Sequence, residues 1–169
     1  SDPSQALDRT DPVASADATT AQSYILSFAT INTVGAAASS NAGNVSSYTF
    51  SYNSGTTGVN RALFVGISYR HACFGGCDKT VGSVTYGGQA LTQVGVVSYE
   101  TGSVPVTRHA RVYIYRLVNP PTGANNLVVN WSSSLEQGAV IGAVTYDNVN
   151  QSTPTGTFAS ATGTSTTPS

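Results

Sequence analysis

Hydrophobic and polar residues alternate with a period of two along most of the chain after residue 22. Successive side chains of a β-strand point to opposite faces, so this alternation predicts strands with one buried face. The stretch SYILSFATI places Tyr24, Leu26 and Phe28 on one face of such a strand. The same pattern recurs in SYTFSYN (47–53), RALFVGISY (61–69), RVYIYRLV (111–118) and LVVNW (127–131).

Glycine and proline mark the turns between these stretches. In SVTYGGQALTQVGVVSY (83–99), Gly87 and Gly88 can adopt the positive φ that a two-residue hairpin turn requires. The stretch GAVIGAVTYDNV (138–149) is apolar on both faces, which predicts a central strand that is covered on each side. Because helical periodicity is lacking, seven to nine short strands predict an all-β protein, a β-sandwich of the jelly-roll or immunoglobulin-like kind.

The two ends of the chain differ in composition from the alternating part. Residues 1–21 carry four aspartates and one arginine, a net charge of −3, and predict an acidic N-terminal extension. Residues 158–169 are rich in Ser and Thr, which is typical of a tail or linker. Residues 22–157 are long enough for one β-sandwich domain. Since residues 22–169 carry a net charge of +2, the extension can lie on this domain or on that of a neighbour, and the alternative is a free acidic tail.

Composition narrows the classes of function. Charged residues make up only 9 % of the 169 residues and the net charge is −1, so nucleic acid is not an expected partner. No apolar run reaches the 18 residues of a membrane-spanning helix, so membrane insertion is not expected either. The low charge content and the abundance of Ser and Thr favour an extracellular or cell-surface location.

The two cysteines lie close together in HACFGGCDK (71–79). A disulfide between Cys73 and Cys77 across the Gly-Gly turn suits an oxidising exterior and is the favoured interpretation. The alternatives are free thiols or a metal site, since thiolates and the imidazole of His71 are good ligands for zinc or copper. A fourth ligand, such as His109, has to come from another strand. No metal and no cofactor are therefore expected.

Catalytic motifs are lacking in the sequence. A hydrolase needs a nucleophile beside a base or two facing carboxylates, and the chain has two histidines, two glutamates and no GxSxG motif. Lys79, the only lysine, is able in principle to form an isopeptide bond with an Asn or Asp, but a solvated lysine is the expectation. The sequence thus favours a non-catalytic protein.

Three aromatic residues are candidates for a sugar-binding surface. If Val112 and Ile114 face the core, Tyr113 and Tyr115 share the outer face of their strand, and Trp131 adds a third ring. Such rings can stack on sugars, which makes a surface polysaccharide a candidate partner. The alternative is that the rings cover a second sheet or a subunit interface, where Tyr and Trp are also favoured.

Four motifs occur in a fixed order over residues 60–157: NRALFVGISY, SVTYGGQALTQVG, RVYIYRLVNPPTGANNLVVNW and GAVTYDNVNQSTPTGT. In this order they resemble β-sandwich modules of large secreted and surface proteins of prokaryotes. The resemblance implies an extracellular, non-catalytic module, and it brings no binding residues to transfer. The insert around Cys73 and Cys77 departs from the plainer pattern of these modules.

The N-terminal part has a looser resemblance to pilin-type filament subunits. In those subunits an N-terminal extension adds a strand to the sandwich of the next subunit. Tyr24, Leu26 and Phe28 have the alternation that such a donor strand needs, although the same strand can instead complete its own domain. We therefore expect a structural subunit that polymerises with copies of itself by donor-strand complementation. The alternative is a carbohydrate-binding or adhesive module of a larger secreted protein.

Overall fold

The computed structural model describes residues 29–74, 78–103 and 106–163. This part of the chain is all-β and has no helix. Its nine strands are β1 (Thr33–Ala42), β2 (Ser47–Asn53), β3 (Ala62–Phe74), β4 (Val81–Tyr86), β5 (Gln89–Ala90), β6 (Thr92–Ser103), β7 (Val106–Val118), β8 (Ala124–Trp131) and β9 (Ala139–Tyr146). No helix in these residues is therefore long and apolar enough to cross a membrane.

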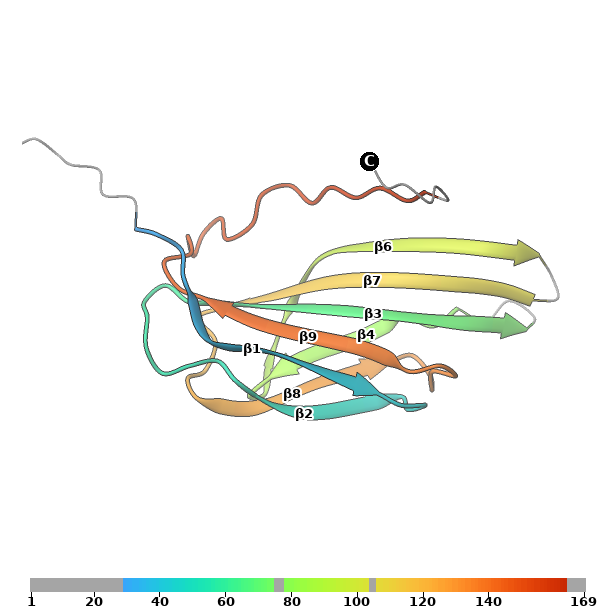
Figure 1. Cartoon of the computed structure of the whole chain (residues 1–169), viewed down its shortest axis with the longest axis horizontal. Coiled ribbons are helices and arrows are strands. Elements are labelled where there is room, and N and C mark those ends of the chain that lie inside the picture. The colour runs from blue at the N-terminus through green and yellow to red at the C-terminus, as the bar shows by residue number, and fades with distance from the viewer. Residues whose placement is uncertain (1–28, 75–77, 104–105, 164–169) are drawn as a thin grey trace, which may run out of the picture.

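The strands form two antiparallel sheets, and the predicted β-sandwich is confirmed (Figure 1). The five-stranded sheet has the order β1-β9-β3-β7-β6, and the four-stranded sheet has the order β2-β8-β4-β5. Alternate residues of β3, β8 and β9 pack between the sheets, because a strand with one apolar face must bury it against another layer. The side chains of Leu63, Val65, Ile67, Leu127 and Ile141 are completely buried there.

Local pattern predicted most of these strands. The face of β3 that carries Leu63, Val65 and Ile67 points inward as expected, and β2 has the predicted bounds. Gly87 and Gly88 form the expected turn after β4, with φ values of 55° and 80°. Only the two residues of β5 return beside β4, and the chain then crosses to the other sheet as β6.

One strand of the five-stranded sheet was not predicted, and one expectation about this sheet was wrong. Strand β1 is composed largely of Ala, Ser and Gly, carries no alternating pattern, and forms through its pairing with β9. Strand β9 was expected to be covered on both faces, but in the described residues only its inner face is covered. Val140 on the outer face is 53 % exposed.

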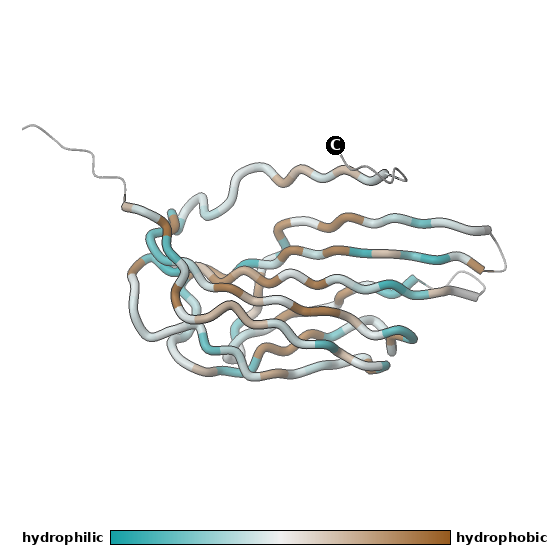
Figure 2. The backbone as a smooth tube through the Cα atoms, viewed as in Figure 1, coloured by the Kyte–Doolittle hydropathy of each residue, from teal (hydrophilic) through white to brown (hydrophobic). Residues whose placement is uncertain are grey.

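Three strands of the larger sheet, β3, β6 and β7, extend beyond the four-stranded sheet at the end away from the start of β1 (Figure 1). The far parts of β3 and β7 contain hydrophilic residues (Figure 2), and His71, His109 and Arg111 are the inner-face residues there. A sheet face without a second layer above it need not be apolar, since water can solvate it. This projecting end therefore differs in chemistry from the closed core.

The segment after β9 lies along the outer face of the larger sheet. The ring of Phe158 covers Gly95 of β6 so closely that a Cβ at Gly95 would overlap it. Arg116 of β7 donates a hydrogen bond to the hydroxyl of Thr155. Phe158, the first residue of the predicted tail, is thus packed on the sandwich, whereas residues 159–163 are exposed (Figure 1).

Candidate functional site

The predicted donor residues Tyr24, Leu26 and Phe28 lie outside the residues that the structure describes. The structure describes the β-sandwich domain that follows these residues in the chain. Every residue of the buried apolar cluster lies between Ala42 and Ala143, and its members Tyr52, Tyr86 and Leu63 are 1 %, 0 % and 0 % exposed. The described core is therefore formed by residues of the strands and of the loops between them.

The predicted disulfide concerns residues that are also largely outside this description. Cys73 belongs to β3 and pairs in register with Thr107, but its side chain is not described. Cys77 lies outside the described residues. The disulfide thus stays a prediction.

The proposed sugar platform of Tyr113, Tyr115 and Trp131 was wrong. These side chains are 4 %, 6 % and 5 % exposed and belong to the core, whereas Val112 is 44 % exposed on the outer face. Tyr113 stacks on Tyr115 and on Tyr69, which in turn meets Trp131 edge to face. The rings cover a second sheet, as the alternative interpretation required, and the alternation alone could not tell which face of β7 is inside.

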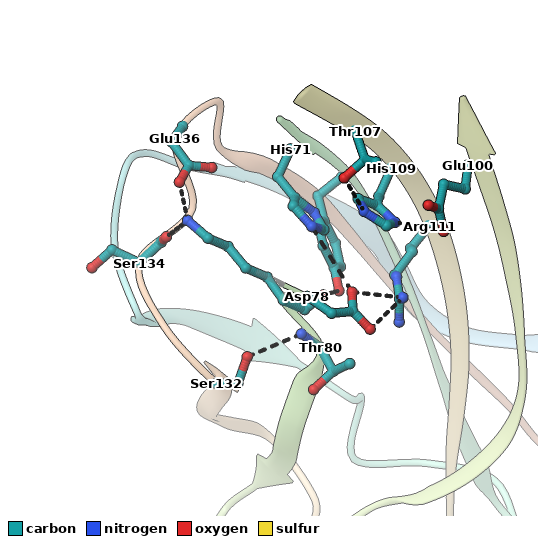
Figure 3. Close-up of polar contacts among 12 residues, drawn as sticks. His71, Asp78, Thr80, Glu100, Thr107, His109, Arg111, Ser132, Ser134 and Glu136 are labelled. Atoms are coloured by element: carbon teal, nitrogen blue, oxygen red, sulfur yellow. Dashed lines mark hydrogen bonds and ion pairs between the residues drawn. The ribbon is translucent and has the colours of Figure 1, made fainter. Parts of the chain in front are cut away.

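Lys79 also differs from expectation, because it is buried and not solvated. Its Nζ donates hydrogen bonds to the Glu136 carboxylate and to the carbonyl of Ser134 (Figure 3). This contact lowers the pKa of Glu136, chiefly through the hydrogen bond from Lys79. A buried ammonium is stable only with such partners, so Lys79 ties the segment before β4 to the loop before β9.

Strand β6 forms an open edge of the five-stranded sheet. Within the described ranges β6 pairs only with β7, and no strand pairs with its other edge, although β6 is 12 residues long. Its sequence TQVGVVSYETGS contains one charged residue, Glu100, and neither lysine nor proline. Val96 and Tyr99 on this strand are each 37 % exposed. A long edge with so few charges is a template for another strand, because its backbone N–H and C=O groups lack partners.

The chain enters β1 at the opposite edge of the same sheet. Residues 29–32 are not a strand, and they are fixed to the loop after β9 by several hydrogen bonds. Asn148 donates from its side chain to the Thr30 carbonyl at 2.8 Å, and Asp147 accepts from the Asn32 backbone at 3.1 Å. The position from which residues 1–28 leave the domain is therefore defined by β9 and not by β6.

A polar cluster occupies the inner face of the projecting end (Figure 3). His71 of β3 lies opposite His109 of β7, and His109 lies opposite Glu100 of β6. The two imidazole rings are stacked, with centroids 4.7 Å apart and planes 10° apart. Strand register thus brings together three titratable side chains from three strands.

Asp78 joins this cluster from the segment before β4. Both of its carboxylate oxygens accept hydrogen bonds from Arg111, at 2.7 and 2.8 Å. One of them, Oδ1, also lies 3.9 Å from Nε2 of His71. His109 has Thr107 Oγ1 at 3.2 Å from Nε2 and a Glu100 oxygen at 3.6 Å from Nδ1.

His71 is the unusual member of the cluster. Its side chain is completely buried, and neither ring nitrogen has a hydrogen-bond partner in the described part of the chain. Burial, followed by the nearby His109, lowers the pKa of His71. Both causes favour the neutral form of the ring, and a neutral imidazole has one nitrogen with a free lone pair.

Sequence reasoning noticed His71 and named His109 as a ligand that another strand would have to supply, but it missed Asp78. The one available signal was the spacing in HACFGGCDK, which places Asp78 seven residues after His71. The pairing of His71 with His109 depends on the register of β3 and β7, which their separation of 38 positions in the chain does not reveal.

The fold and these surfaces define the class of protein, an all-β sandwich of two antiparallel sheets with an open edge and a polar projecting end. Comparison with protein-family models, with curated proteins and with solved structures finds no match.

Proposed function

We propose that the protein is a non-catalytic extracellular structural subunit that polymerises into a surface filament through its N-terminal segment. The observation that carries the proposal is the unpaired edge of β6 in the described structure, 12 residues long with a single charge. Residues 22–28 have the alternating pattern of a strand that can pair with such an edge.

The reach of the chain favours pairing between two copies. Thr30 is held at the end of β9 by Asn148, and Phe28 lies two residues before it, so Phe28 reaches at most about 7 Å from Thr30. Strand β6 lies three strands away from β9, a distance of about 14 Å. A strand that ends at Phe28 therefore cannot run along β6 of its own chain.

The arrangement of edges then determines the kind of assembly. The N-terminal segment leaves beside β1 and β9, whereas the acceptor β6 lies at the far edge of the same sheet. A contact between two different surfaces of identical subunits is heterologous, and it generates an open filament when the rotation does not close.

The test compares the full chain with edge and donor variants by size-exclusion chromatography and electron microscopy. We expect the full chain to form filaments, and we expect Leu26→Asp and Val96→Lys to stay monomeric while folding normally by circular dichroism. Val96 is 37 % exposed, so a lysine there is tolerated and blocks edge pairing as in natural edge strands.

Thr49→Lys is the matched control, because Thr49 is exposed on β2, an edge strand of the other sheet. This variant should assemble like the unmodified chain. A full chain that remains monomeric at high concentration, or a Val96→Lys protein that forms normal filaments, would show that β6 is not the acceptor.

An extracellular location also predicts the disulfide between Cys73 and Cys77. Intact mass measured with and without reductant before alkylation decides this point. The oxidised protein should lack two hydrogens and resist alkylation until it is reduced, whereas two alkylated thiols without reductant would contradict the prediction.

Glycan binding is a second candidate function, and the candidate site differs from the one that the sequence predicted. A hollow of about 350 Å³ on the projecting end is lined by Arg70, Arg108, Tyr99 and Thr101 among others. Exposed guanidinium groups beside an aromatic ring suit a carboxylated polysaccharide. Binding to acidic but not neutral glycans on an array, lost in Arg108→Ala, would support this candidate, and no glycan binding would remove it.

A further inference from the structure

The polar cluster of the projecting end has the composition of a metal site. It combines two imidazoles and one carboxylate from His71, His109 and Asp78, and one donor atom of each lies within 4.8 Å of the others. Neutral imidazole and carboxylate are good ligands for divalent transition metals, zinc above all. These three residues come from β3, from β7 and from the segment before β4.

The buried state of His71 is the second, independent observation. An imidazole whose two nitrogens are both buried without partners costs free energy, since the ring has given up its hydrogen bonds to water. Asp78 Oδ1 lies 3.9 Å from His71 Nε2, which is too far for a hydrogen bond. An ion between them would give both groups a ligand bond.

The surrounding groups have the arrangement of a metal site's outer shell. A ligating histidine usually donates its other N–H to a carboxylate, and Glu100 lies 3.6 Å from Nδ1 of His109. A proton on Nδ1 leaves the Nε2 lone pair, now near the Thr107 hydroxyl, available to an ion. Arg111 likewise holds the carboxylate of Asp78, as outer partners hold ligating carboxylates in known sites.

We propose that His71, His109 and Asp78 bind one divalent transition-metal ion of the zinc type at the projecting end of the sandwich. Ligand atoms around a tetrahedral zinc lie about 3.3 Å apart, so the three side chains must close by about 1 Å or more, which rotation of the imidazole rings can supply. Water completes the coordination. The ion would join three segments that the four-stranded sheet does not cover.

This proposal is independent of filament assembly, and it is tested on the full chain without an affinity tag. The protein is stripped with EDTA, titrated with zinc chloride by calorimetry, and analysed for bound metal by mass spectrometry. We expect one zinc per chain, and we expect Asp78→Asn and His109→Asn to weaken binding by about tenfold or more. Both side chains are less buried than His71, so these variants should fold, which circular dichroism verifies.

Asp147→Asn is the matched control, because Asp147 is a carboxylate after β9 that bonds to Asn32 and lies outside the cluster. It should bind zinc like the unmodified chain. Binding that is absent in the full chain, or unchanged in both ligand variants, would overturn the proposal.

Cobalt substitution separates this site from the thiolate alternative. Co²⁺ on nitrogen and oxygen ligands should give visible d–d bands without the strong near-ultraviolet band of a thiolate complex. A thiolate band would place the ion on Cys73 or Cys77 and would also overturn the proposal.

Discussion

Tyr113 illustrates how one residue's role depends on the face of its strand. Its ring is 4 % exposed and stacks on Tyr69 of the neighbouring strand β3, so it contributes to the core and not to a binding surface. Removing a large buried ring costs both the lost hydrophobic transfer and the cavity left behind.

We expect Tyr113→Ala to lower the free energy of unfolding by about 3 kcal/mol or more, measured by urea denaturation. Val112→Ala on the neighbouring exposed position is the control, and it should change stability far less. A Tyr113→Ala protein of normal stability would mean that the ring is not part of the core.

The contact between Lys79 and Glu136 predicts that the stability of the fold depends on pH. The hydrogen bond from Lys79 lowers the pKa of Glu136 in the folded state below its unfolded value. The stability from this contact is therefore complete above the usual glutamate pKa of about 4.3 and is lost as the pH falls through the folded pKa.

We expect Glu136→Gln to be less stable than the unmodified chain at pH 7, with the difference shrinking as the pH falls below about 4. Thermal denaturation of both proteins across this pH range measures the difference. A difference that is constant with pH would show that the carboxylate's charge does not stabilise the fold.

Among the elements, β9 depends on a turn that only glycine fits. Gly138 precedes the strand with a φ of 74°, and a Cβ there would overlap the carbonyl oxygen of Ala42 at the end of β1. Gly142 lies within β9, and a Cβ there would meet nothing within 4 Å. Alanine substitutions at these two positions therefore compare a blocked glycine with an unblocked one.

We expect Gly138→Ala to destabilise the protein by more than about 1 kcal/mol, because alanine at positive φ is strained and the carbonyl must also move. Gly142→Ala should be close to neutral. Chemical denaturation compares them, and equal stabilities would contradict the turn geometry.

At the scale of the whole molecule, charge is divided between the two parts of the chain. Residues 1–21 carry −3 and residues 22–169 carry +2, so in the proposed filament the opposite net charges favour contact between the extension of one copy and the domain of the next. Attraction between exposed charges is weak and is screened by salt.

We expect filament assembly to weaken a few-fold between about 50 and about 500 mM NaCl, over which the Debye length falls from about 14 to about 4 Å. A variant with Asp8→Asn and Asp11→Asn should lose most of this salt dependence, as sedimentation of the filaments at each salt concentration measures. Identical salt dependence in both proteins would show that the acidic extension takes no electrostatic part in assembly.

The sequence by itself determined the elements that local chemistry controls. Alternation defined β2, β3 and β8, and the Gly87-Gly88 pair defined the turn after β4, because side-chain period and backbone φ are local properties. The absence of a helical pattern gave the all-β class, and the described residues contain no helix.

Only the tertiary structure decided which faces and which distant residues meet. Period two does not say which side of β7 is inside, so Tyr113 was assigned to the wrong face. Strand β1 exists through its partner β9, Lys79 is buried through its contact with Glu136, and His71 meets His109 through strand register. These features depend on long-range pairing, which a local pattern of apolar and polar residues does not contain.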